Sequence, residues 1–549
     1  MDEMEIDDLR NSKSSTEITN ILRKFVKDNE KTFKFPELTK RFNRVLLWTT
    51  LFQHLQNDAL VSTHALCLKA LRILSRDQDD IENVLCERWV ITLIDKSGLL
   101  EPMESAEKDP TLLVVPCKEV AIEAMKCLCN ITFNSELARN VCVNTRIAHG
   151  LITRMKICKH IPYKKELMQY DMKLIFILTA LIENIRLKFR HEDGAMHMIN
   201  YLNEIYSESL QPSSDEASVS ANSEDAPKYY FTDEDRVIVC ELSKALFNLI
   251  ILPNEDTPTT EKEKQQFTNL VSVLGKIMTV QTSSKSNDLD LMNNIVNLLT
   301  SIHTLFYMSL TEEIGDKQKP DHIYEGRDMT SLVILLQFLK HQLTASDERQ
   351  NLYEKLSPIL TVLNKCARVR VQRKFLRKAV LPHLRDVSKP PEQGDELRNH
   401  LCRLLTTPVT SVRDLVAEFL FVLCKEKVSR MVKYTGFGNA AGHLASRGLL
   451  AGGRGARYSS SSDSETEEYR RHAHALDPVV GCTRPPPADP FRGMTDEQKE
   501  YEAMKLVNLF DKMVTAGVVK PARVGADGQL QAVEHVLQLR EDLPKRTMS

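Results

Sequence analysis

Serine and threonine hydroxyls stand among acidic residues in one short stretch near the C-terminal end of this chain. The segment from Ser459 to Tyr469 contains four acids and no basic residue. Acidophilic kinases of the casein-kinase-2 type require an acid three residues after the hydroxyl that they phosphorylate, and the segment offers this spacing repeatedly. The pattern predicts phosphorylation at Ser459, Ser460, Ser462 and Ser464, with Ser459 dependent on a phosphate already placed on Ser462.

A run of basic side chains upstream has the opposite character. From Lys365 to Arg385 there are eight lysines and arginines and no acid. A phosphate adds about −1.5 to −2 charges and three acceptor oxygens, and arginine and lysine are its natural receptors. The two segments therefore suggest an intramolecular phosphate site. The alternative is a disordered acidic linker beside an ordinary solvated basic helix.

Other kinds of chemistry find no support in the sequence. The twelve cysteines form no CxxC or CxxH pattern and no HExxH occurs, so we expect no metal, no cofactor and no covalent catalysis. The glycine segment GFGNAAG lacks the context of a nucleotide-binding loop. A net charge of −2 argues against a nucleic-acid partner. The acidic N-terminus and the short apolar runs predict neither a signal peptide nor a membrane span.

The elements that would position these residues are helices. Apolar residues recur at i, i+3 and i+4 through most of the first 430 residues, where proline and glycine are sparse. A similar apolar segment recurs every 50 to 68 residues. The segments are centred on Leu74, Leu128, Leu178, Leu246, Leu299, Leu363 and Leu423. We therefore predict an all-α, armadillo/HEAT-like helical-repeat superhelix over residues 1–430, with loop insertions near 208–228 and 252–266.

A different composition follows residue 430. We predict a glycine-rich loop over 431–457, an acidic, phosphorylatable and proline-rich linker over 458–492, and a flexible tail over 518–549. Between this linker and this tail, residues 493–517 predict one amphipathic helix, capped by Thr495 with Gln498 and ended by Gly517.

Polar residues flank the repeated leucines two positions before and two after, and therefore share a helix face. Most of these positions carry cationic or hydrogen-bonding side chains, for example Arg72 with Arg76, Lys126 with Asn130, and Lys244 with Asn248. In armadillo-like stacks such a face can hold a helix or a peptide by its backbone or its terminal carboxylate. Ordinary solvated helix faces would show the same pattern, so periodicity leaves both interpretations open.

Several phrases closely resemble the synembryn family, which comprises the cytosolic chaperones and nucleotide-exchange factors of heterotrimeric G-protein α subunits (Gα). They are RILSRD (72–77), MKCLCN (125–130), VLPHLRDV (380–387), AEFLFVLC (417–424), KYTGFGNAAG (433–442), the serine cluster, and GMTDEQKEYEAMKLVNLFDKM (493–513). The resemblance covers nearly the whole chain. It implies a guanine nucleotide exchange factor without covalent chemistry that stabilises nucleotide-free Gα.

The resemblance also implies roles for particular residues. A concave groove would hold the C-terminal helix of Gα through Arg72, Arg76, Lys126, Asn130, Phe176, Lys244 and Asn248. The late amphipathic helix would contact Gα through Leu506, Val507, Phe510 and Met513, the alternative being that it packs back on the superhelix. Phosphate on the serines would be received by Arg370, Lys374 and Arg430.

These expectations describe a cytoplasmic monomer that can be recruited to the cell cortex, with Gα and a casein-kinase-2-type kinase as partners. The competing hypothesis is an armadillo-type scaffold or cargo adaptor without exchange activity.

Overall fold

The computed structural model describes residues 3–39, 43–79, 81–100, 117–209, 229–250, 260–315, 320–344, 351–450, 466–483, 493–525 and 529–533. The chain divides into two compact units, Met1–Leu310 and Thr311–Ser549. Among the described residues, no helix combines the length and the apolar character needed to cross a membrane.

The first unit consists of helices. Their bounds are α1 (Glu3–Asn11), α2 (Ser15–Asn29), α3 (Pro36–Thr39), α4 (Asn43–Leu55), η2 (Asp58–Thr63), α5 (His64–Leu74), α6 (Ile81–Val84), α7 (Glu87–Lys96), α9 (Lys118–Asn134), α10 (Glu136–Asn144), α11 (Ile147–Ile157), η4 (Cys158–His160), α12 (Lys164–Leu181), α13 (Glu183–His191), α14 (Gly194–Ser209), α15 (Asp233–Ile250), α16 (Glu261–Ile277), α17 (Lys285–Ser301) and η5 (Thr304–Leu310).

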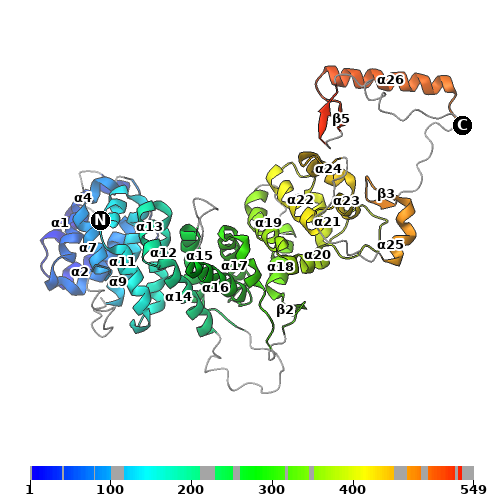
Figure 1. Cartoon of the computed structure of the whole chain (residues 1–549). Helices are drawn as coiled ribbons and strands as arrows, with labels where there is room; N and C mark the ends of the chain where they lie inside the picture. The colour runs from blue at the N-terminus through cyan, green and yellow to red at the C-terminus, as the bar shows by residue number, and fades with distance from the viewer. Residues whose placement is uncertain are drawn as a thin grey trace. The chain divides into compact units, whose positions relative to one another are not determined.

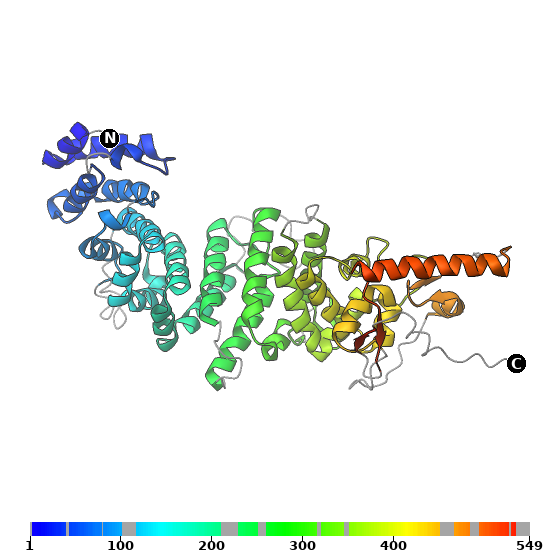
Figure 2. The same ribbon diagram turned by 90° about the horizontal axis from the view of Figure 1, so that it is seen from above.

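One long helix of each repeat packs against the corresponding helix of the next. Helices α5, α9, α12, α15 and α17 contact one another in chain order, and both views show them side by side from blue to green (Figure 1; Figure 2). The repeated leucines of these helices, from Leu74 to Leu299, are fully buried. The 3.6-residue period of the sequence therefore produces the expected all-α armadillo/HEAT-like stack, in which each repeat buries its apolar face on its neighbours.

Arginine side chains recur at the junction between a long helix and the short helix that follows it. The guanidinium of Arg139 on α10 donates to the carbonyls of Thr132 and Phe133 at the end of α9, at 3.2 and 3.1 Å. Arg186 on α13 makes the same contacts to the end of α12. A helix leaves its last carbonyls without partners, so these arginines satisfy them and fix the turn between two helices.

A buried ion pair connects the layers of the first unit. Nε of Arg154 on α11 lies 2.8 Å from a carboxylate oxygen of Asp171 on α12, and Nη1 of Arg154 donates to the carbonyl of Ser97 at 2.7 Å. Complete burial raises the pKa of Asp171, while Arg154 opposes that shift. A buried charge is tolerated only when paired in this way.

The second unit is also helical, with three short hairpins. Its elements are β1 (Ile323–Tyr324), β2 (Arg327–Asp328), α18 (Thr330–Thr344), α19 (Leu352–Arg368), α20 (Arg370–Val380), α21 (Leu397–Leu404), α22 (Thr410–Leu423), α23 (Val428–Thr435), α24 (Phe437–Ser446), α25 (Glu467–His472), η6 (Ala473–Ala475), β3 (Leu476–Asp477), β4 (Cys482–Thr483), α26 (Asp496–Thr515), β5 (Ala522–Val524) and β6 (Leu530–Ala532). Helix α22 lies at the centre, in contact with α19, α20, α21, α23 and α24, and its Leu423 and Phe419 are fully buried.

The end of the helical body was predicted too early in the sequence. The segment 431–457 was expected to be a glycine-rich loop, but helix α23 continues to Thr435 and α24 spans Phe437–Ser446. Only Gly436 between them adopts a positive φ, of 74°. Helix α24 tolerates its glycines because Ala440 and Leu444 are buried against the body, so tertiary packing outweighs low helix propensity.

Other boundaries also differ from the sequence prediction. The loop insertion expected at 252–266 ends early, because Thr260 forms a capping box with Glu263 and α16 begins at Glu261. At the insertion expected near 208–228, α14 continues to Ser209, and residues 210–228 lie outside the described part. The linker 458–492 contains α25 and a β3–β4 hairpin. The tail 518–549 contains a β5–β6 hairpin. The capping box of Thr495 with Gln498 and the end of α26 before Gly517 are confirmed.

Candidate functional site

Seven predicted residues lie half-buried on the long helices α5, α9, α12 and α15 of the first unit or, for Arg76, in the turn after α5, and we call them the polar face. They are Arg72, Arg76, Lys126, Asn130, Phe176, Lys244 and Asn248. The four helices are consecutive in the stack. The structure therefore brings residues up to 176 positions apart in the sequence onto one run of four stacked helices.

A carboxylate that the sequence analysis missed organises the cations at one end of the polar face. Glu123 is 5% exposed, and its two oxygens accept hydrogen bonds from Nε of Arg72 at 2.7 Å and from Nζ of Lys126 at 2.8 Å. It therefore joins α5 to α9. Arg76 lies in the turn after α5, and partial burial together with the nearby Arg72 lowers the pKa of its guanidinium.

Aromatic rings support three of the cations. Arg76 lies over Phe33 at 5.3 Å, Lys126 over Tyr170 at 5.3 Å, and Lys244 over Phe176 at 5.9 Å, measured to the ring centroids. Such contacts hold a cation in place without neutralising it. A face of this kind offers hydrogen-bond donors and positive charge to a carboxylate or to the end of a helix.

The two asparagines of the polar face bind the neighbouring helix. Nδ2 of Asn130 donates to Oγ of Ser75 at 2.9 Å and to the carbonyl of Arg72 at 3.3 Å. Nδ2 of Asn248 contacts Oγ1 of Thr179 at 3.2 Å and the carbonyl of Phe176 at 3.3 Å. The same arrangement thus occurs twice, two helices apart in the stack. Both asparagines fix the register between helices, whatever else they contact.

Seven cations of the second unit lie on α20, on α23 and in the turn before α23, and we call them the basic cluster. It comprises Arg370, Arg373, Lys374, Arg377, Lys425, Lys427 and Arg430. Desolvation lowers the pKa values of Lys425 and Arg430, and the nearby Arg377 lowers both further. Like charges held this close favour an anion.

The three predicted phosphate receivers differ in their surroundings. Arg370 is exposed at the start of α20, whereas Arg430 is half-buried near Arg377. Nζ of Lys374 already lies 2.7 Å from the carboxylate of Glu325, which sits at the tip of the β1–β2 hairpin. The predicted phosphorylation sites Ser459, Ser460, Ser462 and Ser464 lie outside the described residues.

Helix α26 displays the predicted apolar residues at its surface. None of its residues is buried. Leu506 is 63% exposed, Val507 58% and Phe510 43%, while Met513 is half-buried. An apolar stripe of this length on a capped helix is typical of a segment that binds in a groove of another surface.

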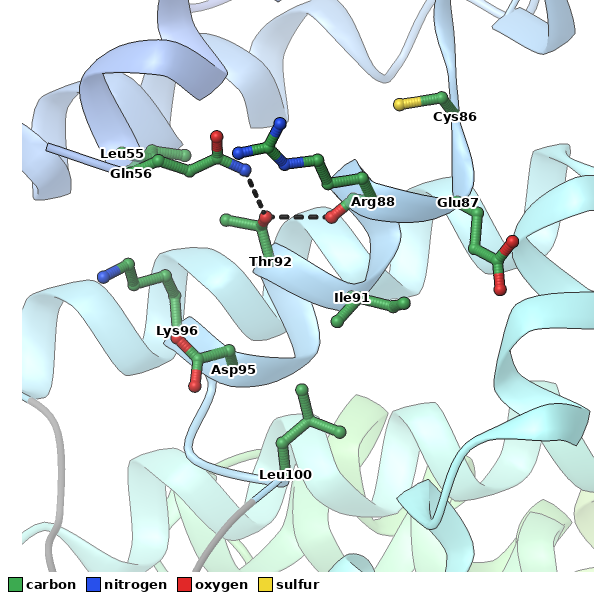
Figure 3. A pocket seen from close by; sticks show the side chains of 10 residues that line it. All are labelled: Leu55, Gln56, Cys86, Glu87, Arg88, Ile91, Thr92, Asp95, Lys96 and Leu100. Carbon is green, nitrogen blue, oxygen red and sulfur yellow. Dashed lines mark hydrogen bonds between the residues drawn. The ribbon is translucent and has the colours of Figure 1, made fainter.

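A pocket of the first unit is lined by none of the polar-face residues. It has a volume of about 830 Å³ and is lined chiefly by α7, together with the end of α4. On its wall, Nε2 of Gln56 donates to Oγ1 of Thr92 at 3.0 Å, and that hydroxyl donates to the carbonyl of Arg88 (Figure 3). None of the residues predicted from the sequence lines it.

No cluster in the described part of the chain is suited to bind a metal: no three His, Cys, Asp or Glu side chains converge there.

Sequence reasoning missed Glu123, Tyr170 and Glu325. Glu123 could have been found from its position three residues before Lys126, since residues at this spacing meet on a helix surface. Tyr170 and Glu325 could not, because their partners lie on other elements. Their contacts depend on which helices pack together.

The chain matches known proteins over most of its length. The family model described as guanine nucleotide exchange factor synembryn matches residues 67–529. A protein named Chaperone Ric-8 from Drosophila pseudoobscura pseudoobscura is 36% identical over 97% of this chain and 96% of its own. Chaperone Ric-8A from Danio rerio is 35% identical over 93% of this chain and 92% of its own.

Among solved structures, SYS-1 is similar with a TM-score of 0.40 and 12% identity, over 84% of this chain and 68% of that chain. The family assignment therefore rests on the sequence matches. On these grounds the chain belongs to the synembryn family of guanine nucleotide exchange factors.

Proposed function

We propose that this protein is a chaperone and non-receptor guanine nucleotide exchange factor for heterotrimeric G-protein α subunits. In this proposal the polar face binds the C-terminal helix of Gα and the protein stabilises Gα without nucleotide. Membership of the synembryn family supports the general activity. The observation that carries the site is the placement of Arg72 and Lys126 on the two sides of the buried Glu123.

The terminal carboxylate of the Gα helix is the chemical feature that suits this face. Nε of Arg72 donates to Glu123, and in this proposal the two terminal nitrogens of the guanidinium donate to the carboxylate of the Gα helix. A paired carboxylate and guanidinium form charge-assisted hydrogen bonds, which are about twice as strong as neutral ones. Arg76 and Lys126 add positive charge beside it.

Exchange then follows from differential binding. Withdrawing the C-terminal helix from the Gα core loosens the loop that contacts the guanine base, so GDP dissociates. The protein binds this open state more tightly than the nucleotide-loaded state, and a ligand shifts an equilibrium only by such a difference. GTP reverses the process by rebuilding the nucleotide pocket. No covalent bond is made or broken by the chain.

Helix α26 provides a second contact with the client. Its exposed Leu506, Val507, Phe510 and Met513 pack on the Ras-like domain of Gα near the nucleotide-dependent switch region. The absence of buried residues on the described α26 supports this role over packing against the helical body. Two linked contacts raise the overall affinity above that of either one.

Phosphorylation regulates the second unit. A casein-kinase-2-type kinase modifies Ser459, Ser460, Ser462 and Ser464, and the basic cluster receives the phosphates through Arg370, Lys374 and Arg430. The mutual repulsion within the cluster supports this assignment, because each phosphate relieves it. Lys374 would exchange its present partner Glu325 for phosphate.

Peptides corresponding to the C-terminal helix of an inhibitory-class Gα test the polar face. We expect the peptide with a free carboxylate to bind roughly 10- to 100-fold more tightly than the amidated peptide, as charged hydrogen bonds contribute about 1.5–3 kcal/mol. Arg72→Gln should remove this preference. Arg88→Gln, on the separate pocket of α7, should leave it intact. Equal affinity for both peptides in the unmodified protein would refute carboxylate recognition.

A further inference from the structure

The glycine segment that ends the helical body binds a turn from the tail of the same chain. The backbone N–H groups of Phe437 and Gly438, at the start of α24, donate to the carbonyls of Pro478 and Val479, each at 2.8 Å. The first N–H groups of a helix have no partner within it. The turn between β3 and β4 therefore caps α24 with its own carbonyls.

Three glycines make this close approach possible. A Cβ on Gly436 would lie 3.0 Å from the carbonyl oxygen of Val480, and one on Gly438 would lie 3.2 Å from that of Val479. On the tail side, Gly481 has a φ of 76°, and a Cβ there would meet Pro391 at 2.8 Å and Gly436 at 3.0 Å. Only glycine adopts such a φ without strain. Both surfaces are thus shaped for each other.

Contacts on both sides of the turn extend the interface. Thr466 donates its hydroxyl to the carbonyl of Leu384 at 2.5 Å, and Nζ of Lys433 lies 3.9 Å from the ring centroid of Tyr469. At the other end, the N–H of Thr483 donates to the carbonyl of Val387 at 2.9 Å, beside the buried Cys482. The whole stretch 466–483 is held on the helical body.

We infer that the segment 466–483 is an intramolecular anchor, which shortens the tether between the helical body and the client-binding helix α26. This inference rests on the proposed function of α26. Asp496, where α26 begins, comes thirteen positions after Thr483, a separation that can span at most about 45 Å. Without the anchor the N-terminal tether of α26 would start at Ser446, fifty residues before Asp496, with a reach of about 170 Å.

The length of the tether sets the strength of the second contact. The effective concentration of a tethered group falls roughly as the −3/2 power of tether length. Releasing the anchor would therefore lower the contribution of α26 to Gα affinity by roughly five- to tenfold. The contacts of α26 itself would be unchanged.

Glycine substitutions on each side of the interface release the anchor. Gly481→Val acts on the tail, and Gly438→Val acts on α24. Gly442→Val is the matched control, because Gly442 lies on the same helix and a Cβ there would meet nothing within 4 Å. Deuterium exchange at the amides of Phe437 and Gly438 should accelerate in Gly481→Val relative to the unmodified protein. Unchanged exchange there would disprove the anchor.

Affinity for nucleotide-free Gα then tests the tether in the full-length protein. We expect a five- to tenfold loss in Gly438→Val and Gly481→Val, no loss in Gly442→Val, and no further loss when Gly481→Val is added to Leu506→Glu/Phe510→Glu. An equal loss in that α26-disabled background would contradict the tether. If the unmodified protein fails to bind Gα, the proposed function fails, whereas amide exchange still decides whether the anchor exists.

Discussion

The carboxylate of Glu123 lies 2.7 Å from Nε of Arg72, and it reaches Lys126 as well, at 2.8 Å. Glu123 is almost completely buried, and its hydrogen bonds hold two cations of the polar face in position from the interior side. The arrangement orients both cations while leaving them half-exposed.

Replacing Glu123 by Gln should destabilise the first unit. Arg72 and Lys126 would lose their shared charged partner, and a hydrogen bond to a charged group contributes about 1.5–3 kcal/mol. Thermal unfolding followed by circular dichroism measures the change. Glu241→Gln is the control, since Glu241 pairs with the more exposed Lys244, and we expect less than about 1 kcal/mol there. Equal effects of both substitutions would show that Glu123 has no special role.

Asn130→Ala should lower the free energy of unfolding by about 1–2 kcal/mol, because its amide holds Ser75 and the carbonyl of Arg72. Ser75→Ala removes only one of these contacts. The double substitution should therefore cost less than the sum of the two single ones, as expected for residues in contact. Strict additivity would exclude the hydrogen bond across α5 and α9.

Lys425→Gln should stabilise the second unit at neutral pH and low salt. The folded pKa of Lys425 is lowered by burial and by Arg430 and Arg377. Below that pKa the charged lysine therefore destabilises the folded state. This destabilisation is lost as pH rises from the folded pKa to the unfolded pKa. Unfolding at several salt concentrations checks this, because screening should shrink the gain. A destabilised variant at every salt concentration would contradict the repulsion.

His443→Gln should reduce the acid sensitivity of the second unit. Burial, with a contribution from Arg447, lowers the pKa of His443 to about 4. A neutral His443 thus contributes stability above its unfolded pKa near 6.5, and that contribution is lost as pH falls through about 4. Stability measured between pH 4 and pH 7 should depend less on pH in the variant. Parallel profiles would show that His443 does not titrate in this way.

Helix positions could be predicted from the sequence because burial imposes a 3.6-residue period. The repeated leucines from Leu74 to Leu423 are buried as expected, and Thr495 caps α26 as its capping box indicated. The prediction of a loop around Gly436 and Gly438 was wrong, because it relied on the tendency of glycine to end helices. Here these glycines allow the turn at Pro478 to pack closely against α24. This contact joins segments forty residues apart, so it could not be predicted from local helix propensity.

The candidate site was predicted less completely. Periodicity and family resemblance proposed the cations of the polar face, which are half-buried in the structure. They gave no sign that Asn130 and Asn248 bind neighbouring helices, or that Lys374 already has Glu325 as a partner. Such pairings depend on the packing of elements distant in the sequence.

The rate of GDP release from an inhibitory-class Gα tests the central claim most directly. We predict that the full-length protein accelerates release and forms a complex that elutes as one species on a sizing column and dissociates on addition of GTP. Arg72→Gln/Lys126→Gln should impair both effects. A stable complex with unchanged GDP release would instead indicate a scaffold, and would contradict the exchange mechanism proposed for the polar face.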